Sequence, residues 1–581
     1  MSKYRTSVLV LLLLCLLESC NDKADDKLFT AMSASQTKVN FINPIVESEE
    51  LNIMRYDYLY NGGGVAIGDI NQDGLEDIYF TGNMVDNKLF LNKGNFEFED
   101  ITASAGVSGS GGWSSGVTMA DVNCDGLLDI YVCRSAYDNY RKRKNLLYIN
   151  NGNLTFTEQA ESFGIDDSGY STHATFFDYD QDGDLDMYLL NHSLSQYSGL
   201  NNEIAELKNR SNPMFGDKLF NNQNGHFVDV TSSSGIKSNV LGFGLGVAVS
   251  DINGDGWTDI YVSNDFNEQD YLYINNQKGG FNEELENYIA CVSLNSMGSD
   301  IADINNDGYM DILTLDMLPE SNYRQKITAG PDNYYKFGLL EKLGFYHQGM
   351  RNMLQLNHGS NRGFSEIGQL SGISNTDWSW AALAADFDND GLKDVFITNG
   401  FKHNFTNMDF IKYLADETIK EKNGNKKKSD MRIIEKMPPV DIPNYIFKNN
   451  GDLTFDAVME EWGMDENSKS NGAAYADLDN DGDLDLVINN IDASASIYRN
   501  NANKLTQNHF LKIKLVGSEC NVYGLGATIK VKTGKTTISQ ELMPSRGFQS
   551  SVGYGMTIGL GRAERVDTLS IFWLNGKRQV L

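Results

Sequence analysis

Seven short acidic segments carry the residues of this chain that are best suited to chemistry. Each follows the pattern D-x-[DN]-x-D-G-x-x-D, and the first runs from Asp69 to Asp77. Calcium takes about six to eight oxygen ligands in a flexible shell, and Asp and Asn at alternate positions of a tight loop can supply them. The Gly at the sixth position permits the sharp turn that aims these oxygens inward. The pattern therefore predicts seven calcium-binding loops.

Within each loop we assign side-chain ligands to positions 1, 3, 5 and 9, with a backbone carbonyl near position 7 and water completing the shell. The loop is not an EF-hand, which needs its bidentate Glu at position 12. A cluster of Asx turns without metal is the alternative. Because seven equivalent turns carry equivalent sites, we expect the ions to be structural. The predicted ligands are Asp69, Asn71, Asp73 and Asp77; Asp121, Asn123, Asp125 and Asp129; Asp178, Asp180, Asp182 and Asp186; Asp251, Asn253, Asp255 and Asp259; Asp303, Asn305, Asp307 and Asp311; Asp386, Asp388, Asp390 and Asp394; and Asp477, Asp479, Asp481 and Asp485.

The segments around each loop read as four short strands. An apolar stretch of small residues precedes the loop, a β-rich run such as Asp259-Ile-Tyr-Val262 follows it, and then come an apolar pair ahead of an Asn and a last short strand. Four strands in each of seven repeats predict an all-β fold, a seven-bladed β-propeller over residues 37–503. The seventh repeat lacks its fourth strand, and we expect Lys38 to Asn43 to supply it and close the ring.

These repeats resemble the FG-GAP/VCBS type, similar to the calcium-loop blades of integrin α-subunit propellers. From about His509 the pattern changes, with Gly524-Leu-Gly-Ala527 and Gly559-Leu-Gly561 among its marks. This part resembles the ASPIC/UnbV module that follows such propellers in the cartilage-acidic-protein family. The resemblance implies a small β domain over residues 508–581, which could extend beyond Leu581, and protein or glycan partners at the cell surface. It implies no reaction.

The N-terminus is typical of an export signal. Lys3 and Arg5 precede an apolar run from Val8 to Leu17, which is too short to span a bilayer. The run ends in Leu-Glu-Ser-Cys20, which resembles a bacterial lipobox with Cys20 as the lipidated residue. We therefore predict a lipoprotein signal peptide over residues 1–20, a flexible tether over 21–36, and a lipid anchor in the outer membrane, at the cell surface or in the periplasm. An ordinary cleaved signal is the alternative.

The net charge and the cysteine content exclude some classes of partner and of fold. A formal charge of −31 repels phosphate backbones, which argues against nucleic-acid binding. Apart from Cys15 and Cys20, the chain has four cysteines. These are too few for a fold that depends on disulfides. Cys124 and Cys133 flank one turn and could pair.

Long insertions indicate where a ligand would bind. They fall between the second and third strands, at residues 191–217, 316–351 and 399–444, and therefore gather on the face away from the acidic loops. Eight residues before each loop stand Asn61, Trp113, Tyr170, Phe243, Asn295, Trp378 and Lys469, at the mouth of the central channel on that face. Trp113, Tyr170, Phe243 and Trp378, together with the channel-facing His173, form the predicted ligand-binding set. Packing as core under the insertions is the alternative.

The sequence favours a binding or adhesion module, because it shows no nucleophile motif or phosphate loop. A calcium-dependent polysaccharide lyase or glycosidase is the rival, with His173, Asp300 and Asp377 the nearest candidates for acid/base work. An accessory subunit of an outer-membrane uptake assembly is a third possibility.

Overall fold

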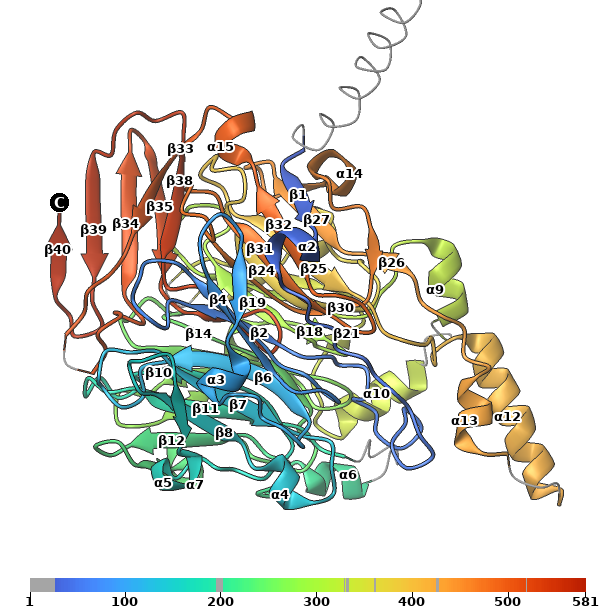
Figure 1. Cartoon of the computed structure of the whole chain (residues 1–581). Helices are drawn as coiled ribbons and strands as arrows, with labels where there is room; N and C mark the ends of the chain where they lie inside the picture. The colour runs from blue at the N-terminus through green and yellow to red at the C-terminus, as the bar shows by residue number, and fades with distance from the viewer. Residues whose placement is uncertain are drawn as a thin grey trace, which may run out of the picture.

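The computed structural model describes residues 27–194, 202–328, 330, 334–359, 362–424, 428–518 and 520–581. The signal peptide, Cys20 and the first part of the predicted tether lie outside these ranges. The described chain is mainly β in its regular structure, with its strands gathered in many small, mostly antiparallel sheets (Figure 1). Within it, we find no helix that combines the length and the apolar character needed to cross a membrane.

Seven four-stranded sheets, each antiparallel and each built around one acidic loop, make up most of the described chain. The loop joins the first strand of a sheet to the second, as the repeat predicts. Innermost strand first, the sheets are β2 (Val65–Gly68), β3 (Asp77–Phe80), β4 (Lys88–Asn92), β5 (Phe98–Asp100); β6 (Ser114–Ala120), β7 (Asp129–Arg134), β8 (Leu146–Asn150), β9 (Phe156–Glu158); β10 (Ser171–Phe177), β11 (Asp186–Asn191), β12 (Lys218–Asn222), β13 (Phe227–Asp229); β14 (Gly244–Ser250), β15 (Asp259–Asn264), β16 (Tyr271–Asn275), β17 (Phe281–Glu283); β19 (Ser299–Ala302), β20 (Asp311–Thr314), β22 (Met353–Asn357), β23 (Phe364–Glu366); β24 (Ser379–Ala385), β25 (Asp394–Asn399), β27 (Tyr445–Asn449), β28 (Phe455–Ala457); and β30 (Ser470–Ala476), β31 (Asp485–Asn490), β32 (Ser496–Asn500), β1 (Phe29–Met32).

The innermost strands of neighbouring sheets contact one another in chain order, and β30 of the last sheet contacts β2 of the first. The sheets therefore follow one another around a common centre in a propeller-like arrangement. Every residue of these seven strands is buried. That burial explains why the sequence of each innermost strand is a run of small and apolar residues and does not alternate.

A one-turn helix follows the outermost strand of every sheet. Most of these helices end at a Gly in the left-handed conformation, such as Gly106 with φ of 78°, which reverses the chain toward the next innermost strand. The helices are α3 (Thr102–Ala105), α5 (Ala160–Phe163), α7 (Thr231–Ser234), α8 (Leu285–Tyr288), α11 (Gly368–Ser371), α14 (Met459–Trp462) and, after β1, α2 (Ala34–Thr37).

The N-terminal end supplies the fourth strand of the seventh sheet, but not with the residues we predicted. β1 pairs with β32 in the register Phe29↔Asn500, whereas Ile42 and Asn43 form only isolated bridges to Ser494 and Ile491. The predicted tether is therefore wrong from residue 27 onward. Phe29 explains the difference, because it is 2% exposed and packs edge-on against Phe387 of the neighbouring acidic loop.

The insertions lie on the face away from the acidic loops, as predicted. Figure 1 shows α9, α10, α12 and α13 on one side of the sheets and the C-terminal strands on the other. The insertions carry α6 (Asn202–Leu207), α9 (Asn322–Thr328), α10 (Tyr334–Lys342), α12 (Met408–Lys422) and α13 (Asp430–Ile434), with the short strands β21 (Gln348–Gly349) and β26 (Ile442–Pro443). Other connections carry α4 (Tyr140–Arg143), β18 (Val292–Ser293) and β29 (Asn467–Ser468).

The C-terminal segment, preceded by α15 (Ala502–Leu505), forms two further sheets. One pairs β33 (His509–Ile513) with β38 (Met556–Gly561), and the other has the order β35 (Thr536–Glu541), β34 (Thr528–Thr533), β39 (Thr568–Phe572) and β40 (Arg578–Val580).

Between these strands lies a hairpin of β36 (Ser545–Arg546) and β37 (Ser550–Ser551), which joins the sheet of β2 at the centre of the ring. We call residues 543–552 the central hairpin. The segment expected to form a separate small domain thus contributes to the core of the repeats.

Candidate functional site

Each acidic loop is organised by hydrogen bonds from backbone N–H groups to its first and last Asp. In the first loop, Asp69 accepts from Asp73 and from Gly74 through its two carboxylate oxygens, each at 3.0 Å. Asp77 accepts from Ile70 at 3.1 Å through Oδ2. The last Asp makes the same bond in all seven loops. These bonds fold the loop so that the carboxylates converge.

The Asn that recurs after the third strand ties the loops together. Its backbone N–H donates to the last Asp of its own loop, as Asn357 does to Asp311 at 2.7 Å. The Asn357 side chain donates to the carbonyl oxygens of Met310 in its own loop and of Ile252 in the preceding loop. Six of the seven Asn residues bridge to the preceding loop in this way. The third sequence signature is therefore a link between neighbouring sheets.

Three loops bring the carboxylates of positions 1, 3 and 9 within 4.8 Å of one another, and such a cluster can hold a metal ion. They are the loops with Asp at position 3, namely Asp178, Asp180 and Asp186; Asp386, Asp388 and Asp394; and Asp477, Asp479 and Asp485.

The electrostatics of the third loop favour a cation. One carboxylate oxygen each of Asp178 and Asp180 is buried without a hydrogen-bond partner in the described part of the chain. Burial raises the pKa of Asp186 to about 9. A buried carboxylate that lacks a partner costs free energy, which a bound cation would offset.

The sixth and seventh loops also receive cations from the chain itself. Lys448, next to the linking Asn449, donates to Asp388 and to Asp390, the latter at 2.8 Å. Lys512 of β33 donates to Asp477 at 2.8 Å. Positions 3 and 5 of the sixth loop therefore already face an ammonium group, which sets this loop apart from the others.

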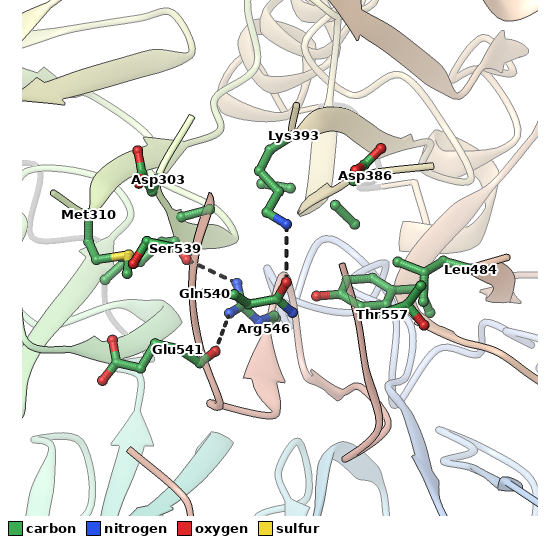
Figure 2. Close-up of a pocket in the computed structure, with 15 residues that line it drawn as sticks. Asp303, Met310, Asp386, Lys393, Leu484, Ser539, Gln540, Glu541, Arg546 and Thr557 are labelled. Atoms are coloured by element: carbon green, nitrogen blue, oxygen red, sulfur yellow. Dashed lines mark hydrogen bonds between the residues drawn. The ribbon is translucent and has the colours of Figure 1, made fainter. Parts of the chain in front are cut away.

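The C-terminal strands cover the acidic-loop face. Tyr523 donates to the carbonyl of Gly126 in the second loop at 2.9 Å. Figure 2 shows Lys393 of the sixth loop reaching Gln540 of β35, with a distance of 3.1 Å.

A disulfide also joins the two parts, between Cys124 of the second loop and Cys520. The predicted pairing of Cys124 with Cys133 is wrong, because Cys133 is a buried free thiol in β7. Cys124 lies at position 4 of its loop with φ of 64°, and it bonds to the C-terminal segment that lies across this face.

The predicted aromatic ring stands at the start of the innermost strands, but most of it is buried. Trp113, Tyr170 and Phe243 are 2%, 5% and 3% exposed. Residues 44–62, which we call the cover segment, cover two of them: Tyr56 packs edge-on against Trp113 at 6.0 Å and Tyr58 against Phe243 at 5.7 Å between ring centroids. Tyr170 packs against His192 and Phe215. Prediction of these three as ligand contacts is therefore wrong, since neighbouring aromatic rings occupy the faces that a ligand would need.

His173 lies in the innermost strand β10, and it is 2% exposed. Its ring lies close to Gly116, and neither ring nitrogen has a hydrogen-bond partner among the described residues. Burial lowers its pKa to about 3. His173 therefore sits as a neutral core side chain that a substrate does not reach.

The two carboxylates considered for acid/base work are both held in ion pairs. Asp300 accepts from Arg546 of the central hairpin at 2.7 Å, and Asp377 accepts from Arg324 of α9 at 2.8 Å. Neither faces a second carboxylate within these contacts. An acid/base pair at this mouth would need groups other than the predicted ones.

A pocket of about 450 Å³ remains open on the insertion face. Trp378, from the predicted set, lies in its wall beside Phe401 and Phe405, with ring centroids 4.1 Å and 5.1 Å away. The cover segment, the residues after β15 and β20, and α12 complete it. The lining residues are Ile53, Met54, Asp57, Tyr58, Tyr60, Asn61, Asp265, Phe266, Asn295, Met297, Met317, Trp378, Trp380, Phe401, Phe405, Thr406, Phe410, Ile411, Leu414 and Met437.

Sequence reasoning missed most of this pocket. Asn61, Asn295 and Trp378 were expected at the mouth, but Phe401, Phe405 and the apolar residues of α12 were not singled out. The available signal was the aromatic content of the insertion itself, where Phe401, Phe405 and Phe410 fall within ten residues of one another.

Comparison with known families agrees with this architecture. The FG-GAP-like repeat family matches residues 69–132, 135–189 and 251–314, and the ASPIC and UnbV family matches residues 517–581. The chain thus carries FG-GAP-like repeats and an ASPIC/UnbV domain. The central hairpin and the C-terminal strands from β34 onward lie within the residues matched by the ASPIC and UnbV family, whereas β33 precedes them.

Curated proteins to which the chain is similar include cartilage acidic protein 1. The human protein is 29% identical over 226 residues, which is 38% of this chain and 31% of that protein. The Xenopus tropicalis protein is 31% identical over 208 residues, or 35% of this chain and 29% of that protein. The chain therefore matches less than a third of the length of these relatives.

Two solved structures match the chain at low identity and low TM-score. An Agrocybe aegerita lectin that recognises non-reducing terminal N-acetylglucosamine has 16% identity, covering 70% of this chain and 84% of its own, with a TM-score of 0.36. A Bacillus licheniformis rhamnogalacturonan lyase has 11% identity, covering 82% and 76%, also with a TM-score of 0.36. At these TM-scores the two likenesses say nothing about what this chain binds.

Proposed function

We propose that this chain is an exported, calcium-binding repeat protein that acts as a binding or adhesion module for a protein or glycan ligand at the cell surface. The observation that carries the proposal is the aromatic pocket on the insertion face. Its volume of about 450 Å³ lies within the range of ligand sites, and it is built from long insertions on a rigid scaffold, where binding residues tend to gather.

Calcium at the acidic loops would be structural. The residues fit the ion, because the three-carboxylate loops present converging oxygens and two of these oxygens in the third loop lack partners among the described residues. Oxygen-rich loops of this kind suit calcium. The ion supplies positive charge, while the loop backbone and the linking Asn residues hold each turn to its neighbour.

A binding screen tests the proposed function. The mature protein is applied to glycan and protein panels in calcium and in chelator, together with Phe405→Ala, which alters the half-exposed pocket wall. Phe337→Ala is the matched control, because Phe337 is an exposed aromatic side chain of α10 outside the pocket. We expect a ligand that binds the wild type and the control alike and loses about tenfold or more in affinity to Phe405→Ala. A ligand that binds all three proteins equally would place the binding site elsewhere.

Export and anchoring are tested separately at Cys20. We propose that Cys20 is lipidated and that the chain is held at the outer membrane through residues 21–26. The wild type should incorporate labelled fatty acid and sediment with outer membranes, whereas Cys20→Ser should do neither. Equal membrane association of the two proteins would show that the anchor is not at Cys20.

A further inference from the structure

The seven repeats differ at one position of the third strand, and the difference follows the type of acidic loop. Four loops carry Asn at position 3, and in each of these repeats the residue before the linking Asn is apolar. Three loops carry Asp at position 3, and there the same residue is polar or basic. The apolar residues are Leu91, Ile149, Ile274 and Leu356, and the others are Asn221, Lys448 and Arg499. The two positions therefore vary together within this one chain.

The structure gives a physical reason for the pairing. Where position 3 is Asn, its side-chain amide donates to the Asp at position 5, as Asn71 does to Asp73 at 2.9 Å, and all four loops share this bond. An ionised Asp at position 3 cannot donate, so positions 3 and 5 present two carboxylates to each other. In the sixth loop Lys448 donates to both of them, to Asp388 and to Asp390, the latter at 2.8 Å. Its ammonium group thus joins the two positions that an amide joins in the other class of loop.

The chain itself supplies a donor to every carboxylate oxygen at the ligand positions of the sixth loop. Backbone N–H groups donate to both oxygens of Asp386 and of Asp394, and to one oxygen each of Asp388 and Asp390. Lys448 donates to the remaining two oxygens. The third loop differs, because one carboxylate oxygen at each of its positions 1 and 3 is buried without a partner in the described part of the chain.

The sixth loop is also the least negative of the seven. Counted with the lysines that form ion pairs with them, the loops range from −5 in the third to −2 in the sixth. The sixth loop combines four aspartates with Lys393 at position 8 and with Lys448, whereas the third loop has five aspartates. The affinity of an oxygen-lined loop for calcium depends on how many charged ligands it presents. Charge and hydrogen bonding therefore both set the sixth loop apart.

We propose that Lys448 is the built-in cation of the sixth loop, so that calcium fills this loop last. The inference rests on the proposed calcium binding and gives the seven sites an order. An ion enters the sixth loop only when the ammonium group leaves positions 3 and 5. In the third loop an ion meets carboxylate oxygens that lack a partner among the described residues, and it displaces no lysine from them.

Counting the bound ions tests this order. The mature protein is dialysed against a series of free calcium concentrations, and the calcium held per chain is measured by plasma emission. At the concentration where the wild-type count first levels off, Lys448→Ile should hold one ion more, because it gives the sixth repeat the residue of the second and fourth repeats. That ion should bind about tenfold or more tightly than the last ion of the wild type. Equal counts at every concentration would overturn the proposal.

Two further variants separate the charge of Lys448 from its contacts. Lys448→Gln keeps a hydrogen-bond donor without the charge, so it should also gain the ion, and it replaces Lys448→Ile if that variant does not fold. Lys448→Arg keeps the charge and should match the wild type. Lys88→Ile is the matched control, because Lys88 also lies on a third strand and pairs with Asp100 at 2.8 Å, outside the acidic loops. An ion gained by Lys88→Ile, or none gained by Lys448→Gln, would contradict the assignment.

Stability provides a readout that does not depend on counting ions. In chelator, Lys448→Gln should unfold at a lower urea concentration than the wild type, because Asp388 and Asp390 lose their cation. At saturating calcium the difference should shrink, since the ion then replaces the ammonium group in both proteins. A difference of the same size in chelator and in calcium would show that Lys448 and calcium do not compete.

The two proposals fail in different ways. If the wild type binds no calcium at any concentration, the proposed calcium binding is wrong and the order of the sites is wrong with it. If the wild type binds calcium but both charge-removing variants of Lys448 hold the same number of ions at every concentration, calcium binding stands and only the role of Lys448 is wrong.

Discussion

Burial keeps two histidines, His192 and His173, uncharged by lowering their pKa values. His192 is 2% exposed and its ring faces Tyr58 at 4.7 Å between centroids. Burial lowers its pKa to about 4, as it lowers that of His173 to about 3. Both rings are therefore neutral core groups, His192 within the aromatic layer and His173 beside Gly116, and protonation of either would place an unpaired charge in the core.

His173→Gln should make the protein less sensitive to acid. The unfolded chain protonates this histidine near its ordinary pKa of 6.5, whereas the folded chain resists until about pH 3. Stability is therefore complete above pH 6.5 and falls as the pH decreases toward 3. At pH 5 the loss due to this one group is about 2 kcal/mol.

Urea unfolding between pH 7 and pH 4.5 at constant calcium measures this effect. His173→Gln should show a shallower fall in unfolding free energy than the wild type. His226→Gln, at an exposed histidine, should follow the wild type. Parallel curves for all three would mean that His173 already accepts a proton in the folded state.

The central hairpin is the element that joins the ASPIC/UnbV domain to the repeats. Gly547 exchanges two backbone hydrogen bonds with Ser299 of β19, each at 3.1 Å, and Gln549 accepts from Val117 of β6. Phe548 packs against Trp380, which also lines the pocket. A Cβ on Gly64 would lie 1.8 Å from the Gln549 oxygen, which explains why Gly recurs five residues before the loops.

Arg546 anchors this hairpin through a buried ion pair. It donates to Asp300 at 2.7 Å and to the carbonyl oxygens of Ile301 and Met543 at 2.9 Å and 3.0 Å. Figure 2 places it between the C-terminal strands and the sheets, where it also reaches the Glu541 carbonyl. The second oxygen of Asp300 accepts from Ala384, so both partners are satisfied.

Arg546→Met should destabilise the protein by about 3–5 kcal/mol, because it leaves the Asp300 carboxylate buried without its partner. The double variant Asp300→Asn with Arg546→Met should recover most of that loss, since the amide oxygen can still accept from Ala384. Urea unfolding gives the double-mutant cycle, with the surface change Arg565→Met as control. No loss in Arg546→Met would show that the hairpin is not anchored by this pair.

At the scale of the whole molecule, the seven loops should respond to calcium together. Chelation should lower the melting temperature substantially and added calcium should restore it, because ions that bind only the folded chain stabilise it, each by about 2.7 kcal/mol at 100 times its dissociation constant. Thermal melts followed by circular dichroism measure this. An unchanged melting curve in chelator would show that calcium bound at the loops does not stabilise the fold.

The Cys124–Cys520 disulfide should stabilise the whole chain, since it closes a span of 396 residues. In the chain-entropy model a loop of this size contributes on the order of 5 kcal/mol. Cys520→Ser should therefore unfold at lower denaturant than the wild type, and reductant should lower the midpoint of the wild type but not that of Cys520→Ser. Cys291→Ser, at a free thiol, should retain the response to reductant. A reductant-insensitive wild type would contradict the assignment.

Local chemistry let the sequence alone predict the repeats. The acidic loop, the small residues before it and the Asn after the third strand each act within one sheet or between adjacent sheets, so their spacing is preserved in the chain. That spacing was sufficient for the all-β class, the four strands per repeat and the insertion face. It also located Trp378, because the start of each innermost strand follows from the loop position.

Contacts between distant parts of the chain were decided only by the tertiary structure. β1, and not the predicted Lys38–Asn43, pairs with β32 in the seventh sheet, because Phe29 is buried beside Phe387. The cover segment packs on Trp113 and Phe243, Phe215 and His192 pack on Tyr170, and the central hairpin joins the innermost strands. The partner of Cys124 proved to lie 396 residues away. Such pairings depend on which surfaces meet after the sheets form, and residue spacing along the chain does not encode that complementarity.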